Sequence, residues 1–222
     1  MDIDKLALVP EQVRPRRYDS SRRKLAAAQT RSSILAAARE LFVSHGYGTT
    51  TVAAIAERAG VAQDTVYAAV GTKPAIFRLL IESALSGRDE PVPGAQREYA
   101  NQMRAALDVR LKLAIYAAAV SAIQGRLAPL FVALRAAASA NPELAQLWRE
   151  ISERRARNMR ELADDLATTG ELRADLGRDE IADVIWSMNG SEYYALFVLE
   201  RGWAPERFQR WLLDAWTRLL LP

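Results

Sequence analysis

Cysteine is absent from this 222-residue sequence, and histidine occurs only once, at His45. Without cysteine the chain can form no disulfide, no thiolate metal site and no cysteine nucleophile, and this composition is compatible with a reducing cytoplasm. A single histidine excludes a metal cluster built from several histidines, and the sequence contains no glycine-rich phosphate-binding loop. We therefore expect no catalytic residue, no cofactor and no metal site, and hence no enzyme.

Long apolar runs are also missing. No stretch approaches the roughly 20 consecutive apolar residues that a membrane-spanning helix needs. The first twelve residues, MDIDKLALVPEQ, lack the basic block and apolar block of a secretion signal. Hydrophobic residues make up 50% of the chain and charged residues 26%, which is ordinary for a soluble globular protein. We therefore expect a cytoplasmic protein that does not contact a membrane.

Positive charge is concentrated near the N-terminus, although the net charge is only +3. Residues 1–78 carry 12 Lys or Arg against 7 Asp or Glu. Within residues 14–31, seven basic residues accompany a single acid, Asp19. Such a segment is either a solvated tail or a contact for a polyanion. Its position directly before the motif described next favours contact with nucleic acid.

Residues 50–74, TTTVAAIAERAGVAQDTVYAAVGTK, predict two short helices joined by a tight turn. Two helices this short cannot bury a core by themselves, but they suit a helix-turn-helix unit over residues 52–71. The small Ala56 lets the helices approach, and Gly60 can adopt the positive φ of the turn. Val66 then fills the space between the two helices.

Helical periodicity continues along the rest of the chain, and no convincing strand is present. We expect an all-α protein with a flexible basic arm (1–24), a three-helix DNA-binding head (25–87) and a larger helical body (88–222) for ligand binding and dimerisation. Glycine or proline marks most of the expected breaks in the body. The helices expected there cover residues 95–108, 110–124, 126–139, 142–169, 178–199 and 204–220.

Residues 31–81 resemble the DNA-binding domain of tetracycline-repressor-type (TetR) transcriptional regulators. The matching features are ELF followed by GY at the end of the first helix, TT before the second, IAERAGV through the turn, TVY in the recognition helix and GTKPAIF at the start of the fourth. The resemblance implies a homodimer that binds a near-palindromic double-stranded DNA operator. It also implies a small-molecule effector that binds in the body and releases the DNA.

This sequence departs from the family pattern at three places in the recognition helix. Ala62 stands where a serine or threonine often caps the helix, Asp64 is acidic, and the Ala68–Ala69 pair replaces bulkier residues. The expected fold survives these changes. The expected base-reading surface is small and partly acidic.

DNA contacts are expected at the start of the recognition helix and around it. Lys73 stands at a helix start, where free backbone N–H groups and a positive charge together suit a phosphate. Tyr67 reaches a phosphate or is a core tyrosine with a solvated hydroxyl. Gln63 can pair with adenine, and Asp64 either accepts from a cytosine amino group or stabilises the helix start. Arginines before the first helix can enter a minor groove or follow the backbone. The expected DNA-binding residues are Arg22, Arg23, Thr50, Thr51, Gln63, Asp64, Thr65, Tyr67, Ala68 and Lys73.

The last two expected helices are apolar on more than one face. They either complete the core of one chain or pair with a symmetry-related chain as a four-helix bundle, and we favour the second interpretation. The expected dimer interface residues are Ile181, Ile185, Met188, Phe208, Trp211, Leu212 and Trp216.

Aromatic residues and methionine recur in the central helices, where an apolar ligand cavity is expected. Such residues more often form plain core. Asn189 and Glu192 either anchor polar groups of a ligand or are solvated. The expected ligand-binding residues are Tyr116, Phe131, Trp148, Met159, Trp186 and Tyr193.

Together these patterns predict a homodimeric, sequence-specific DNA-binding regulator, a repressor that a small apolar or aromatic molecule releases from its operator. The alternative is a helical architectural or protein-interaction module that binds DNA without an effector. Sequence-selective binding would distinguish the regulator from a module whose binding follows only the salt concentration.

Overall fold

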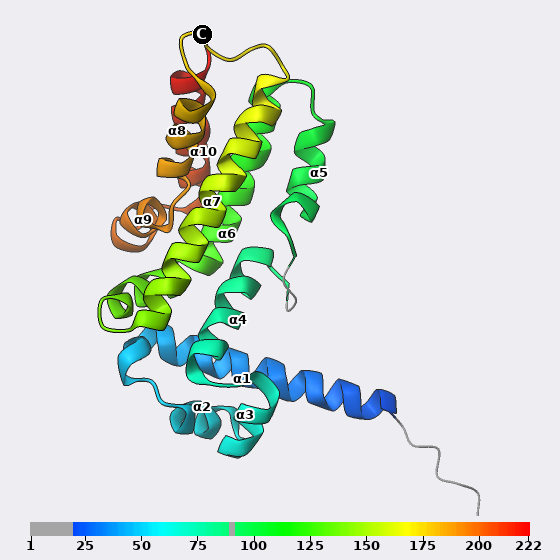
Figure 1. Cartoon of the computed structure of the whole chain (residues 1–222), viewed down its shortest axis with the longest axis vertical. Helices are drawn as coiled ribbons and strands as arrows, with labels where there is room; N and C mark the ends of the chain where they lie inside the picture. The colour runs from blue at the N-terminus through cyan, green and yellow to red at the C-terminus, as the bar shows by residue number, and fades with distance from the viewer. Residues whose placement is uncertain (1–19, 89–91) are drawn as a thin grey trace, which may run out of the picture.

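The computed structural model describes residues 20–88 and 92–222, and every regular element within these ranges is helical. A head lies at one end of an elongated molecule and a helical body at the other (Figure 1). The head contains α1 (Ser20–Thr49), α2 (Val52–Ala59), α3 (Gln63–Val70) and the start of α4 (Lys73–Ser86). The body contains η1 (Gly94–Gln96), α5 (Glu98–Ala105), α6 (Val109–Ala138), α7 (Pro142–Ala167), α8 (Arg178–Met188), α9 (Ser191–Tyr194), the π-helical η2 (Ala195–Glu200) and α10 (Pro205–Leu220). The expected all-α fold is confirmed.

The first helix begins earlier than expected. α1 starts at Ser20, so residues 20–24, which we expected in the flexible arm, are helical. Residues 1–19 of that arm lie outside the described part of the chain. At the other end, Gly46 has a φ of 82° and a ψ of 165°, which interrupts the helical backbone near the predicted stop.

α6 is one helix of 30 residues, although we expected two helices separated at residues 125–129. Pro129 and Gly125 weaken an isolated helix. Here the helix continues through both because it packs against α1, α4, α5, α7, α9 and α10. Tertiary packing overrides local propensity in this element.

α6 is also more apolar than expected, since the sequence predicts no helix long and apolar enough to span a membrane. The helix is long and apolar enough to cross a membrane by length and composition, with a mean hydropathy of 1.5 over its most apolar 18 residues. However, 56% of that window is buried inside the protein. Its apolar side chains form the core between the surrounding helices.

The expected helix over residues 178–199 is instead broken after α8. Asn189 ends α8, and Gly190 is extended with a φ of −70° and a ψ of 155°. A Cβ atom at Gly190 would lie 2.6 Å from a carboxylate oxygen of Glu192 and 3.2 Å from Nη1 of Arg155. Gly190 therefore leaves room beside this corner for the ends of two charged side chains.

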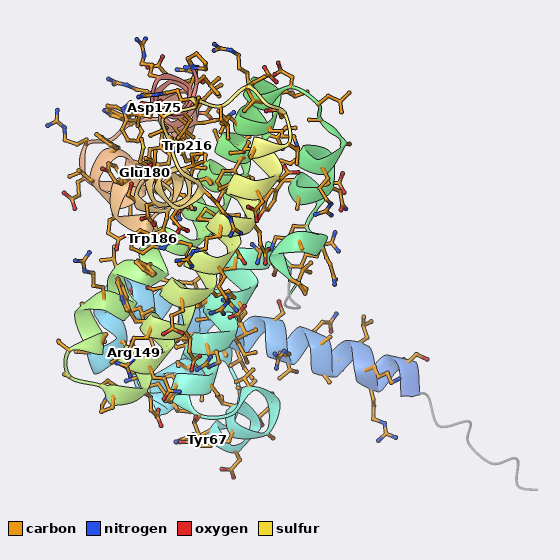
Figure 2. All side chains as sticks on the ribbon, turned by 45° about the horizontal axis from the view of Figure 1, so that its top comes forward. Tyr67, Arg149, Asp175, Glu180, Trp186 and Trp216 are labelled. Carbon is orange, nitrogen blue, oxygen red and sulfur yellow. The ribbon has the colours of Figure 1, made fainter. Side chains whose placement is uncertain are left out.

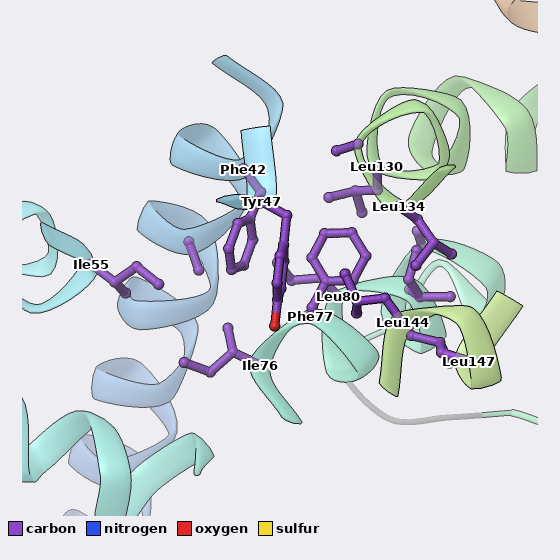
Figure 3. Close-up of a cluster of buried hydrophobic side chains, with 14 of the residues drawn as sticks. Phe42, Tyr47, Ile55, Ile76, Phe77, Leu80, Leu130, Leu134, Leu144 and Leu147 are labelled. Carbon is purple, nitrogen blue, oxygen red and sulfur yellow. The ribbon is translucent and has the colours of Figure 1, made fainter. Parts of the chain in front are cut away.

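The buried side chains form two hydrophobic clusters. The lower cluster joins the head to one end of α6 and α7, and it includes Phe42, Tyr47 and Phe77 as well as Leu134 and Leu147 (Figure 3). The upper cluster joins the other end of α6 and α7 to α5, α8 and α10. The head is thus built into the lower part of the body.

Candidate DNA-binding surface and body cavity

The turn between α2 and α3 has the geometry of a helix-turn-helix. Thr51 caps α2, since its Oγ1 accepts a hydrogen bond from the backbone N–H of Ala54 at 3.1 Å. Gly60 ends α2 with a φ of 69°, a left-handed conformation that favours glycine. Ala56 and Val66 are buried where the two helices meet. Ala56, Gly60 and Val66 therefore have the structural roles that the spacing predicts.

One side of α3 forms an exposed surface. Gln63, Asp64 and Ala68 are exposed, Tyr67 is 45% exposed, and Thr65 is half-buried. Nε2 of Gln63 lies 3.4 Å from the Tyr67 hydroxyl. Tyr67 lies at the end of the head that faces away from the body (Figure 2). The structure therefore brings the expected base-reading residues together on the outer surface of the head.

The expected DNA contact of Thr50 is contradicted by the structure. Its side chain is buried, and its hydroxyl lies within hydrogen-bond distance of the carbonyl oxygens of Gly46, at 2.8 Å, and Leu41, at 3.2 Å. The hydroxyl therefore serves the fold of the head rather than a phosphate. The neighbouring Thr51 is exposed.

Lys73 is the first residue of α4, as expected, and its side chain is held in place. Its ammonium donates to the carbonyl of Gly48 at 3.4 Å and lies 4.2 Å from the centre of the Tyr47 ring. Partial burial lowers the pKa of Lys73. An ammonium has three N–H donors, and the hydrogen bond to Gly48 uses one of them. The group can therefore still donate to an anion beside the helix start.

The basic residues of α1 occupy two different environments. Arg22 and Arg23 lie on the exposed first turns of the helix. Arg31, which we did not select from the sequence, donates from Nη1 to the carbonyl of Ala69 at 2.9 Å. This contact links α1 to the C-terminal end of α3 and fixes the recognition helix against the head.

A cavity of about 680 Å³ lies between α4, α5, α6 and α7, where the two hydrophobic clusters meet. Of the expected ligand-binding residues, Tyr116, Phe131 and Met159 line it. The other three are placed elsewhere. Trp148 stacks on Phe131 with ring centres 4.4 Å apart, and Trp186 packs against the Arg155 guanidinium. Tyr193 stacks with Phe197 and makes a tilted ring contact with Trp211.

A buried polar network closes one wall of the cavity. Nδ2 of Asn189 donates to the Tyr116 hydroxyl at 2.8 Å. The backbone carbonyl of Asn189 accepts from Nε2 of Gln124 at 2.7 Å. The Ser191 hydroxyl donates to Oε1 of Gln124 at 2.6 Å. Burial strongly raises the pKa of Tyr116, so its hydroxyl stays protonated. Asn189 is therefore a buried wall residue, whereas Glu192 is exposed and pairs with Arg135 at 3.4 Å.

Arg155 is the cavity residue that sequence reasoning missed most clearly. Along α7, Leu147, Ile151, Met159 and Ala163 follow a four-residue spacing and are all buried. Arg155 occupies the middle of this series and lines the cavity. A charge in the middle of an apolar helix stripe was the available signal.

Burial contradicts the prediction for most of the expected dimer-interface residues. Six of the seven, all except Trp211, pack inside a single chain and leave almost no surface for a partner. Those six are Ile181, Ile185, Met188, Phe208, Leu212 and Trp216. Trp211 is half-buried, and Ala215 and Leu219 follow it at four-residue spacing along α10. Leu219 is 42% exposed, so this neighbouring stripe of α10 is apolar and open.

Comparisons with known proteins agree with this geometry. Residues 34–80 match the family model described as bacterial regulatory proteins, tetR family. None of the curated proteins matches the chain.

Solved structures extend the likeness to the body. A TetR-family regulator from Mesorhizobium loti described as putative is 21% identical, with a TM-score of 0.66 over 88% of this chain and 98% of that chain. NalD from Pseudomonas aeruginosa, described as the secondary repressor of a multidrug efflux pump, is 19% identical, with a TM-score of 0.66 over 89% and 98%. A transcriptional regulator from Saccharomonospora viridis, solved with choline, is 16% identical, with a TM-score of 0.65 over 88% and 99%.

The family match covers the helix-turn-helix, and the structural match covers nearly the whole described chain. The chain is therefore a DNA-binding transcriptional regulator with the N-terminal domain of the tetR family and the fold of TetR-family regulators.

Proposed function

We propose that this chain is a cytoplasmic homodimeric repressor that leaves its operator when a small molecule occupies the body cavity. The observation that carries this proposal is the position of the cavity at the junction of the two hydrophobic clusters. The lower cluster includes side chains of the head, whereas the upper cluster includes none. A molecule placed between them changes how the head is held on the body, without any catalytic step.

The wall of the cavity includes α4, the helix that leads from the head into the body. Glu82 and Leu85 of α4 line the cavity, and Glu82 pairs with Arg154 of α7 at 2.9 Å. Arg126 of α6 donates to the carbonyl of Ala84 at 3.0 Å. The α1 side chain of Arg39 donates to the Arg126 carbonyl at 2.6 Å. A displacement of α4 by a ligand is thereby transmitted to α1, which contacts α3 through Arg31 and the carbonyl of Ala69.

On the DNA side, we assign Thr51, Tyr67 and Lys73 to phosphates and Gln63, Asp64, Thr65 and Ala68 to bases, with Arg22 and Arg23 at the flanking backbone or minor groove. Phosphate contacts position the head, whereas contacts to base edges give it sequence preference.

Dimerisation supplies the second head. We place the dimer surface on the open α10 stripe of Trp211, Ala215 and Leu219, together with the half-buried Val184 of α8. Two-fold pairing of this surface gives an isologous interface. The two recognition helices of such a dimer read half-sites about one DNA turn, roughly 34 Å, apart.

Selection of binding sites from a random pool of DNA duplexes tests the regulator assignment. The expected result is a near-palindromic consensus whose binding persists against excess unrelated DNA. Binding that shows no consensus and follows only the salt concentration would instead support an architectural module.

The effector assignment is tested with anilinonaphthalenesulfonate, a dye that fluoresces in apolar cavities, and the selected operator. By linkage, the dye should weaken DNA binding by the same factor by which DNA weakens dye binding. Dye binding that leaves operator affinity unchanged would contradict the proposed coupling.

A further inference from the structure

Arg155 lies in an unusual electrostatic environment. Its guanidinium is stacked on the Trp186 ring, with Cζ 4.5 Å from the ring centre, and its buried Nε has no hydrogen-bond partner among the described residues. Burial lowers the pKa of Arg155, while the charge of Glu192 raises it. Glu192 nevertheless pairs with Arg135, and no carboxylate of the described residues forms an ion pair with Arg155. Arg155 is half-buried, and a guanidinium that is partly removed from water without an ion-pair partner is stabilised when a ligand supplies an anion.

The other charges around the cavity do not supply that anion. Glu82 pairs with Arg154 at 2.9 Å, and Asp165 pairs with Lys112 at 2.8 Å. Glu161 is exposed. Arg97 and Arg104 add positive charge to the wall and donate to backbone carbonyls. The cavity therefore has a positive wall in which the acids nearest its interior are already paired.

Two neutral groups beside Arg155 are also incompletely satisfied. The Tyr116 hydroxyl faces only the sulfur of Met159 as an acceptor, at 3.3 Å, which is a weak partner. Oδ1 of Asn189, in a side chain that is 4% exposed, has no hydrogen-bond partner at all. Burial raises the pKa of Tyr116, and the charges of Arg155 and Arg97 oppose that rise, so their positive field extends to its hydroxyl. An anion held by Arg155 can accept a hydrogen bond from Tyr116, and a donor on the same ligand can serve Asn189.

Apolar side chains form another part of the wall. Leu85, Met103, Val120, Leu127 and Phe131 all line the cavity. Such a surface suits a hydrocarbon chain or an aromatic ring.

We propose that the cavity binds an amphipathic organic carboxylate, with the carboxylate on Arg155 and Tyr116 and the apolar part against α4, α5 and α6. This rests on the proposed function, because it names the chemical class of the effector for the same cavity. A neutral or cationic effector would leave the Arg155 charge without a partner.

Matched ligands and matched variants test the inference by direct binding, without DNA. Octanoate and naphthylacetate are each compared with the corresponding primary amide by calorimetry and by the shift in Tm. We expect at least one carboxylate to bind more tightly than its amide. The affinity of Arg155→Met for that carboxylate should be lower by roughly ten- to a hundredfold, because a hydrogen bond between charged groups is lost. Arg155→Lys should retain part of the binding.

The control is Arg157→Met, the same change at an exposed position on the same helix, which should leave carboxylate binding unchanged. A structural role for Arg155 is tested by Tm without ligand. We expect Arg155→Met to keep or raise the Tm, because it removes a half-buried charge that forms no ion pair with a described residue. A lower Tm, or amides that bind as tightly as carboxylates, would overturn the inference.

Operator binding by the same proteins separates this inference from the proposed function. Carboxylate binding that depends on Arg155 but leaves operator affinity unchanged supports the anion site and contradicts the effector role. Operator release by the neutral amides, with no preference for carboxylates, supports the effector role and overturns the anion site.

Discussion

Arg154 and Arg155 are neighbours in the sequence but differ in their partners. Arg154 has a carboxylate partner in Glu82, whereas Arg155 has an aromatic ring on one side and the cavity on the other. Residue type and helix periodicity place both on α7, but they do not reveal which guanidinium is paired. That difference depends on α4, which is more than 60 residues away in the sequence.

Thr50 and Thr51 show the same limit at the head. The sequence predicts a DNA contact for both residues and does not distinguish between them, because both directly precede α2. Only the fold shows that Thr51 caps the helix and that the Thr50 hydroxyl is used by the carbonyls of Gly46 and Leu41. Ala56, Gly60 and Val66 were predictable because their roles depend on spacing within one short motif.

At the residue scale, Lys73 and Gln63 should affect DNA binding in different ways. Lys73→Ala should weaken binding to all duplexes alike and lower the slope of log affinity against log salt concentration by about 1, since one phosphate contact is lost. Gln63→Ala should change which base is preferred in each half-site. Fluorescence anisotropy with operator and single-base variants measures both. A change of sequence preference in Lys73→Ala would show that our sorting of contacts is incorrect.

At the element scale, α2 and α3 depend on the left-handed turn at Gly60. A Cβ atom there meets nothing within 4 Å, so only the φ of 69° opposes substitution. Gly60→Ala should therefore lower the free energy of unfolding by roughly 1–2 kcal/mol, the cost of a left-handed L-residue. Gly48→Ala is the control, because that site is equally open and has no positive φ. Urea denaturation that shows equal losses for both variants would disprove the assigned cause.

The contact between α4 and α7 is a second element-scale feature. Arg154 and Glu82 form a partly exposed ion pair, so their coupling energy in a double-mutant cycle of unfolding should be about 1 kcal/mol or less. Glu82→Gln should nevertheless alter the loss of operator affinity caused by the dye, since Glu82 joins the cavity wall to α4. Titration of the operator complex with dye measures this response. A wild-type response in Glu82→Gln would place the transmission elsewhere in α4.

Most helix positions follow from the sequence, but the continuity of helices does not. Gly125 and Pro129 predict a break that packing around α6 removes. Asn189 and Gly190 form a break that the apolar periodicity of residues 178–199 conceals. In α6 the neighbours of the segment, rather than its own residues, decide the outcome.

At the scale of the whole molecule, the open apolar stripe on α10 should determine assembly. Leu219→Glu puts a charge into the proposed dimer surface and should raise the dimer dissociation constant by roughly tenfold or more. Sedimentation equilibrium measures the change, and operator affinity should fall with it. Leu111→Glu is the control, because Leu111 is similarly exposed, at 52%, on α6. Equal behaviour of the two variants would remove α10 from the interface.

The lower hydrophobic cluster has a consequence for how such regulators diversify. Phe77, Leu80 and Ile81 of α4 share one core with Leu130 and Leu134 of α6 and with Leu144 of α7 (Figure 3). A chimera that exchanges only residues 20–88 would cut through this core and place unmatched side chains against each other. A transplanted operator specificity therefore has to bring the adjoining thirds of α6 and α7 with it, or be confined to the exposed residues of α3.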